Sequence, residues 1–323
     1  MSYAPVTEVE IDAIPVIDIS PLAEGPDGEI KVGSQLLNVV QRIGFFYVAN
    51  HGVNPVLIDK VLNQAKTFFA RPEAEKHEIR VSNVHRGFLP IGEATMSGAR
   101  HEDFKESFVW GWEVAADDPD IFASRGILAP NRWPDFQPEM APILGRYIEK
   151  INALGICLLR AFAAGLGLEH DYFTRSFSKP LTRAAVIHYP PQPEDMGVQH
   201  FGVSPHTDYG CVTFLYQDGT GGLQIMNRDG EWITAHPMPD TFVVNIGDLL
   251  HRWSNDRFIS NPHRVINASG RERFSVPVFV DPDWNTIIKP VPAPGEVPHH
   301  APITCADYIH AIYQKSFAYR QQE

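Results

Sequence analysis

Two stretches carry candidate metal ligands: Pro205-His206-Thr207-Asp208-Tyr209-Gly210 and, further along the chain, Asn261-Pro262-His263-Arg264-Val265. If the first segment is a strand, His206 and Asp208 point to the same face, because side chains alternate along a strand. With His263 they would form a set of two histidines and one carboxylate, a ligand set of non-haem Fe(II) sites that leaves one side of the metal open. The His-x-Asp pair alone is a weak signal, and the same ligands can bind zinc, so a zinc hydrolase is a lesser alternative.

Composition narrows the class of protein. Of 323 residues, 44% are hydrophobic and 20% are charged, which is typical of a globular chain with a substantial core. The net charge of −12 argues against nucleic acid or an anionic membrane as the main partner. The cysteines, Cys157, Cys211 and Cys305, are widely spaced, so neither a zinc knuckle nor a disulfide framework is indicated.

The same features bear on location. Unpaired cysteines fit a reducing compartment. Residues 1–10 do not resemble a secretory signal, and no apolar run reaches the length of a membrane span. We therefore expect a cytoplasmic protein. The sequence gives no indication of its oligomeric state.

The N-terminal half mixes helical and strand patterns. Asn54 is a good helix N-cap because its side chain can accept a backbone hydrogen bond, and Pro55 suits the first helical position. The expected elements are a strand over 14–20, a turn around Gly25 and Gly28, a helix over 31–43, a strand over 45–49, a helix from Pro55 to about Phe69, a short helix after Pro72, loops and short strands over 81–135, and a long helix over 140–167.

After Pro180 short apolar runs follow one another, separated by Gly, Pro, Asn and Asp. The runs are 183–189, 211–217, 222–226, 231–235, 241–246, 263–267 and 273–280, with a final helix over 304–318. Many short strands at near-regular spacing favour a jelly roll or barrel. We expect one domain over 1–323, mainly β with flanking helices. Its parts are an N-terminal module with middle loops over 10–120, the supporting helix over 140–167, a jelly-roll core over 180–290 and the C-terminal helix.

A second polar pair lies ten residues beyond His263. In the strand pattern of 271–279, Arg273 and Ser275 share one face. A guanidinium with a nearby hydroxyl can grip a carboxylate, and an arginine buried in a barrel would be costly without such an anion. The alternative is a surface arginine paired with Glu272 or Asp281.

Taken together, these residues and several further motifs resemble the Fe(II)- and 2-oxoglutarate-dependent oxygenases of the isopenicillin N synthase-like group. The resemblance covers nearly the whole chain. The matching segments are Ile14–Ser20, Gly44–Val53, Arg86-Gly87-Phe88, Lys105-Glu106-Ser107-Phe108, His206-Thr207-Asp208, Gly221-Gly222-Leu223-Gln224, Asn245-Ile246-Gly247-Asp248, His263-Arg264-Val265 and Arg273-Phe274-Ser275.

The resemblance implies a double-stranded β-helix, which is a jelly roll, with an N-terminal oxygenase module. It implies that His206, Asp208 and His263 bind Fe(II). It also implies that 2-oxoglutarate and O₂ are consumed, that succinate and CO₂ are released, and that a C–H bond of a small molecule is oxidised, with hydroxylation as the default outcome. No catalytic residue beyond the metal ligands is implied.

The resemblance also assigns the co-substrate site. Arg273 and Ser275 would hold the distal carboxylate of 2-oxoglutarate, and Tyr189 matches the family tyrosine that hydrogen-bonds in the same region. Many relatives carry asparagine two residues before that tyrosine, where this chain has Ile187. The details of co-substrate contact are therefore expected to differ here.

Substrate contacts are the least determined feature. His200 and His251 are not expected to be further ligands, because the facial set is already complete. Two alternatives stay open: an isopenicillin N synthase-like oxidase that uses no 2-oxoglutarate, and a non-catalytic ligand-binding member of the fold. Residues that could line the mouth of the site, with core packing or the surface as their alternative, are Arg86, His101, Phe104, Ser107, Trp110, Trp112, Phe201, Tyr209 and Phe279.

Overall fold

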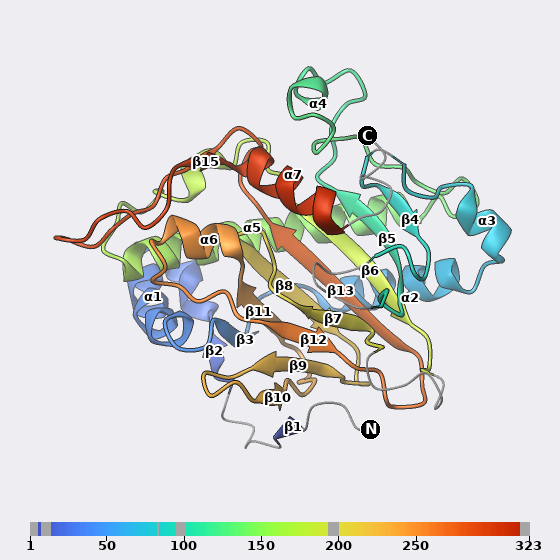
Figure 1. Ribbon diagram of the computed structural model, residues 1–323, viewed down its shortest axis with the longest axis horizontal. Helices are drawn as coiled ribbons and strands as arrows, with labels where there is room; N and C mark the ends of the chain where they lie inside the picture. The colour runs from blue at the N-terminus through green and yellow to red at the C-terminus, as the bar shows by residue number, and fades with distance from the viewer. Residues whose placement is uncertain (1–5, 8–13, 83, 95–100, 193–199, 317–323) are drawn as a thin grey trace.

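Two β-sheets face each other, and helices cover the outer face of the larger sheet (Figure 1). The computed structural model describes residues 6–7, 14–82, 84–94, 101–192 and 200–316. In spatial order, the larger sheet contains β2 (Val16–Asp18), β3 (Phe45–Ala49), β11 (Phe242–Ile246), β8 (Val212–Gln217), β13 (Arg273–Val280), β6 (Arg183–Tyr189), β5 (Glu106–Gly111) and β4 (Gly87–Leu89). The smaller sheet contains β1 (Val6–Thr7), β10 (Trp232–Thr234), β9 (Leu223–Met226), β12 (His263–Val265) and β7 (Val203–His206). Strands distant in sequence are neighbours in both sheets, as expected for the predicted double-stranded β-helix.

The helices largely follow the sequence patterns. They are α1 (Pro26–Val40), α2 (Pro55–Phe69), α3 (Glu73–His77), α4 (Asp120–Ala123), α5 (Met140–Gly165), α6 (Asp248–Trp253) and α7 (Cys305–Ser316), with a two-stranded β14 (Ile287–Ile288) and β15 (Ile303–Thr304) ahead of α7. Asn54 caps α2 as predicted, since its side chain accepts a hydrogen bond of 2.9 Å from the Val56 amide. The last two residues of the predicted 304–318 helix lie outside the described residues.

Several elements differ from the sequence expectation. The first helix begins at Pro26 and includes Gly28, which was predicted to lie in a turn. A Cβ at Gly28 would come within 1.7 Å of the Pro21 carbonyl oxygen, so the glycine is present for close packing. Two short helices were also not predicted: α4, which lies within 81–135 where loops and short strands were expected, and α6.

Strand β13 shows how the fold separates its core from its cavity. Its even-numbered residues, from Phe274 to Val280, pack into the core between the larger sheet and the helices. Its odd-numbered residues, from Arg273 to Phe279, line a cavity between the two sheets. Helix α5 approaches this strand closely, because a Cβ at Gly155 would lie 2.7 Å from a methyl of Val280. The alternation predicted for Arg273 and Ser275 therefore has a physical basis in the two faces of one strand.

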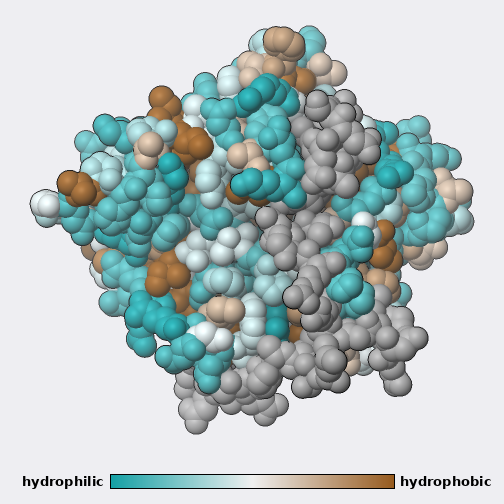
Figure 2. All heavy atoms as spheres, viewed as in Figure 1, coloured by the Kyte–Doolittle hydropathy of each residue, from teal (hydrophilic) through white to brown (hydrophobic). Residues whose placement is uncertain are grey.

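The outer surface carries little contiguous apolar area on the face seen in Figure 2. The coloured spheres there are mainly hydrophilic, and the hydrophobic ones form small separate groups. Among the helices of the described residues, none combines the length and apolarity needed to cross a membrane.

Candidate active site

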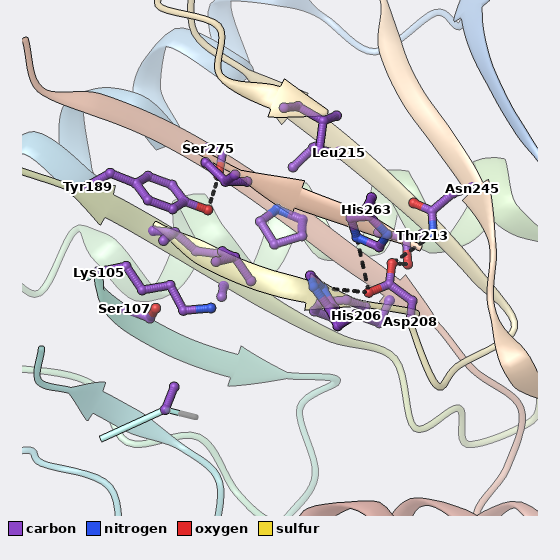
Figure 3. A pocket seen from close by; sticks show the side chains of 18 of the residues that line it. Lys105, Ser107, Tyr189, His206, Asp208, Thr213, Leu215, Asn245, His263 and Ser275 are labelled. Carbon is purple, nitrogen blue, oxygen red and sulfur yellow. Dashed lines mark hydrogen bonds and ion pairs between the residues drawn. The ribbon is translucent and has the colours of Figure 1, made fainter. Parts of the chain in front are cut away.

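Three side chains meet at one end of the cavity between the sheets, and we call them the facial triad: His206, Asp208 and His263 (Figure 3). His206 ends β7, and His263 begins β12 directly opposite it in the antiparallel pair. Asp208 lies two residues past the end of β7, so the proposed same-face alternation along one strand does not account for its position. Its Oδ1 atom is 3.6 Å from Nε2 of His206 and 3.7 Å from Nε2 of His263. Two imidazole nitrogens and a carboxylate oxygen thus converge on one point.

Hydrogen bonds hold the triad in an orientation suited to metal binding. The other oxygen of Asp208, Oδ2, accepts hydrogen bonds from Thr213 Oγ1 at 2.6 Å and Asn245 Nδ2 at 2.8 Å. Its Oδ1 therefore remains available toward the histidines. His206 Nδ1 lies 2.8 Å from the Ser204 carbonyl oxygen, which can only accept. The ring must donate from Nδ1, and its Nε2 lone pair then faces Asp208, as in metal sites whose second ring nitrogen is held by a carbonyl.

The protonation states also suit a cation. Burial by itself would raise the pKa of Asp208, but His263, His206 and Thr213 hold that pKa well below its usual range. Burial, reinforced by the neighbouring His206, lowers the pKa of His263 to about 4. At neutral pH, Asp208 is therefore an anion and His263 a neutral lone-pair donor, which are the forms that a metal requires.

A second polar group lies in the same cavity, and we call it the carboxylate clamp: Arg273, Ser275 and Tyr189. The hydroxyls of Ser275 and Tyr189 are 3.4 Å apart, and the Arg273 guanidinium carbon lies 4.6 Å from the centre of the Tyr189 ring. Figure 3 shows Tyr189 and Ser275 on one side of the cavity and the triad on the other. The cavity has a volume of about 130 Å³ and is lined mainly by apolar residues.

The buried guanidinium of Arg273 is suited to binding an anion. Its side chain is fully buried, with Nε donating to the Gly221 carbonyl at 2.5 Å and Nη2 lying 3.4 Å from Gln217 Oε1. Its Nη1 atom is buried without a hydrogen-bond partner among the described residues. A buried charged donor left unpaired is costly, so a carboxylate bound here would satisfy it. The donor set therefore fits both a divalent metal and a dicarboxylate co-substrate.

The residues predicted to contact substrate divide into two groups. Ser107, Tyr209 and Phe279 line the cavity. Trp110 instead packs fully buried in the helix-side core. Arg86 is buried beside Gly111, with Nη1 donating to the His85 carbonyl at 2.9 Å, away from the cavity lining. The remaining candidates, which are also absent from the lining, are His101, Phe104, Trp112 and Phe201.

Some site residues had no role predicted from the sequence. Lys105 lines the cavity, and its side chain is only 9% exposed. Thr213 and Asn245 are paired across β8 and β11, and both donate a hydrogen bond to Asp208. A signal was present, since each of these two is a polar residue at an inward position of a mainly apolar strand. Ile187, where many relatives have asparagine, also lines the cavity and adds apolar surface there.

His200 and His251, which were not expected to be metal ligands, lie outside the cavity. His200 stacks on His101, with ring centres 4.1 Å apart. His251 lies on α6, in a different cluster with Asp256 and His300. Neither lines the cavity of the facial triad.

Comparison with known proteins gives consistent matches over the whole chain. Residues 181–282 match the 2OG-Fe(II) oxygenase superfamily, and residues 14–136 match the family described as "non-haem dioxygenase in morphine synthesis N-terminal". A 2-oxoglutarate-Fe(II) type oxidoreductase of Emericella nidulans is 33% identical over 317 residues, which cover 94% of this chain and 90% of that protein.

Solved structures of 2-oxoglutarate-dependent oxygenases have the same fold. The structure of full-length Neurospora crassa T7H in complex with α-ketoglutarate and thymine superimposes with a TM-score of 0.82 at 28% identity, covering 95% of this chain and 98% of that one. The structure of JOX2 in complex with 2OG, Fe and JA superimposes with a TM-score of 0.77 at 26% identity, covering 99% and 90%. The chain is therefore a member of the 2OG-Fe(II) oxygenase superfamily, a non-haem iron dioxygenase that uses Fe(II), 2-oxoglutarate and O₂ to oxidise a small molecule.

Proposed function

We propose that the facial triad holds the Fe(II) ion, that the carboxylate clamp holds the distal carboxylate of 2-oxoglutarate, and that the substrate is a small, mainly apolar molecule with one oxygen acceptor. The observation that carries the co-substrate assignment is the unpartnered Nη1 of Arg273 in the same cavity as the triad. Bound Fe(II) with 2-oxoglutarate and O₂ supplies the oxidising chemistry, which releases succinate and CO₂.

The chain's own residues position the reactants. Thr213 and Asn245 fix Asp208 so that one oxygen is directed to the metal. The clamp fixes the opposite end of the cavity, so a five-carbon dicarboxylate would reach from the clamp toward the triad. The apolar lining, including Ile187 and Leu215, limits water beside the reacting centre. Such positioning and exclusion of water are what a protein adds to cofactor chemistry.

Lys105 supports the choice of substrate class. Apart from Arg273 it is the only lysine or arginine among the described residues that line the cavity. Its Nζ atom lies 3.3 Å from Asp103 Oδ2, and Figure 3 shows the side chain extending toward His206. An ammonium has three donors, so donors remain for an oxygen atom of a ligand.

Charge balance supports a substrate without high charge. Fe(II), Asp208, the 2-oxoglutarate dianion and Arg273 together carry no net charge, and Asp103 matches Lys105. A multiply charged substrate would add an unmatched charge to a largely apolar cavity, which is unfavourable. A carbonyl or a single carboxylate beside Lys105 is the group that the cavity accommodates best. The complexes of T7H with thymine and of JOX2 with JA are consistent with small molecules of this kind.

The test is a turnover screen of the iron-loaded protein against small metabolites, with succinate as the readout. Succinate formation should require added 2-oxoglutarate and rise with the true substrate. An active protein that forms no succinate would instead support a 2-oxoglutarate-independent oxidase. His206→Ala should lose iron, as measured by metal analysis after dialysis, and iron retained at the wild-type level would contradict the triad assignment.

Lys105→Met tests the substrate class once a substrate is found. Loss of a charge-assisted hydrogen bond of about 1.5 kcal/mol should raise the substrate KM about tenfold. The change in 2-oxoglutarate affinity should be smaller and should come only from the charge of Asp103 that is left unmatched. Lys31→Met, an exposed lysine on α1, is the matched control and should change neither. An unchanged substrate KM in Lys105→Met would reject the anchoring role.

A further inference from the structure

A second cluster of metal-ligating side chains lies outside the cavity. We call it the His251 cluster: His251 on α6, Asp256 just after α6, and His300 in the segment between β14 and β15. Oδ1 of Asp256 is 3.1 Å from Nε2 of His251 and 2.5 Å from Nε2 of His300. The side chains are between 29% and 35% exposed, so ions in solution can reach them. In Figure 1 the β14–β15 segment extends beside α6, although the two are far apart in the sequence.

The Nδ1 atom of His251 is used in a hydrogen bond to the backbone, and its Nε2 atom faces the carboxylate of Asp256. Its Nδ1 lies 2.6 Å from the Phe258 carbonyl oxygen, which can only accept, so Nδ1 must carry the proton. In the neutral ring Nε2 is then a lone pair, and it faces a carboxylate oxygen that is also a lone-pair donor. Two such atoms at 3.1 Å require a positive charge between them, which is either a second proton on the ring or a metal ion.

The facial triad of the same chain has the same donor types, although its nitrogen–oxygen distances of 3.6 and 3.7 Å are longer than the 3.1 and 2.5 Å of the His251 cluster, where His300 and Asp256 are within hydrogen-bond distance. In the triad, a backbone carbonyl holds Nδ1 of His206, and Nε2 faces Oδ1 of Asp208. In both places a second histidine approaches the same carboxylate oxygen through Nε2. A carbonyl that orients the histidine from behind is a general feature of metal sites.

The backbone around Asp256 is built to keep the carboxylate in place. Asn255 and Asp256 have φ angles of 59° and 64°, so two consecutive non-glycine residues adopt the left-handed conformation, which is unusual and costs free energy. The Asp256 amide donates to the His251 carbonyl at 2.9 Å. Asn255 binds the opposite segment through the Val297 carbonyl and the His299 amide. His299 in turn lies 3.0 Å from Oδ2 of Asp256, which leaves Oδ1 toward the other two histidines.

We propose that the His251 cluster is a second metal site, in which His251, Asp256 and His300 bind a divalent ion of the Zn²⁺ class and His299 orients the carboxylate. Two imidazole nitrogens and one carboxylate oxygen are ligands that Zn²⁺ accepts, with water completing the coordination. The ion would fasten the β14–β15 segment to α6. The Asp248 amide at the start of α6 donates to the Asp208 carbonyl at 2.7 Å, so the tether would support the loop that carries a triad residue.

The experiment measures metal stoichiometry on the full chain after treatment with a chelator. Zn²⁺ is titrated by calorimetry, and Co²⁺ binding is followed by absorbance in parallel. The wild type should bind two equivalents. His300→Ala and Asp256→Asn should each bind one and retain the triad site, whereas His206→Ala should retain the other. His77→Ala is the matched control, because His77 is also a surface histidine 3.5 Å from a carboxylate, that of Glu73.

The outcomes separate the proposal from its alternatives. A wild type that binds a single equivalent, retained in His300→Ala and lost in His206→Ala, would mean that protonated histidines, and not a metal, neutralise Asp256, and would overturn the proposal. Two equivalents retained in both His300→Ala and Asp256→Asn would overturn it as well. Circular dichroism of each variant confirms that a lost equivalent does not reflect unfolding, and the conservative Asp256→Asn change preserves the shape of the site.

Discussion

Replacing Arg273 should separate co-substrate binding from metal binding. Arg273→Met keeps an unbranched apolar stem, about two atoms shorter than the arginine, and removes the charge and every donor. Because the guanidinium is fully buried and its Nη1 is free for a ligand, a carboxylate bound there would gain up to two charge-assisted hydrogen bonds. Each is worth about 1.5–3 kcal/mol, so the affinity for 2-oxoglutarate should fall about 10-fold if one bond is lost and at least about 100-fold if both are lost.

A series of variants of Arg273 and Ser275 separates the contribution of the charge from that of each hydrogen bond. Arg273→Lys keeps the charge but loses the planar fork, so its affinity should lie between those of the wild type and Arg273→Met. Ser275→Ala should lose only about 3-fold to 10-fold, because a single hydrogen bond of about 0.5–1.5 kcal/mol is removed. Arg80→Lys, an exposed arginine paired with Glu93, is the matched control.

The assay is calorimetric titration of 2-oxoglutarate into the metal-loaded protein under anaerobic conditions, with metal content measured separately. The expected order of affinity is wild type, Arg273→Lys, Arg273→Met, at equal metal content. If Arg273→Met bound 2-oxoglutarate as tightly as the wild type, the clamp assignment would be refuted. If it lost metal as well, the two ends of the cavity would not act independently, and that too would contradict the reasoning.

Two further predictions concern metal affinity and packing. Asn245→Ala removes a hydrogen bond that orients Asp208 and should weaken metal affinity about 10-fold to 100-fold, measured by competition with a chelator; unchanged affinity would show that this orienting contact is dispensable. Gly155→Ala should lower the free energy of unfolding by about 1–3 kcal/mol in a denaturant titration, because the new methyl would meet Val280 at 2.7 Å. Gly145→Ala, in the same helix with nothing within 4 Å, should instead stabilise by about 0.5–1 kcal/mol, and equal effects of the two changes would contradict the packing argument.

Features governed by local chemistry could be predicted from the sequence. The N-cap of α2 follows from Asn54 and Pro55 alone, and the two faces of β13 follow from strand alternation. The residue types of the facial triad fitted a metal, but the His-x-Asp pair was a weak signal until the family motifs were considered with it. The spacing of the short strands favoured a jelly roll or barrel, and the family motifs implied a double-stranded β-helix, which the sheets and the structural relatives confirm.

Features that depend on which strands become neighbours could not be predicted. Trp110 and Ser107 are three residues apart on β5, yet one is in the helix-side core and the other lines the cavity. Period-two alternation separates their faces, but only packing of the sheet decides which face is inside. Arg86 is buried beside Gly111, although its sequence context did not distinguish surface from cavity.

The kind of chemistry could therefore be inferred from residue types, since the two histidines, the aspartate and the arginine have their donor and acceptor atoms whatever surrounds them. Tertiary structure decided how those atoms are oriented. Thr213 and Asn245 reach Asp208 only because β8 and β11 pair in one register, and a shift of one residue would turn both side chains to the opposite face. His251 and His300 likewise meet only because the segment before β15 folds back onto α6. Contacts between residues far apart in the chain depend on register and packing, which no local pattern encodes.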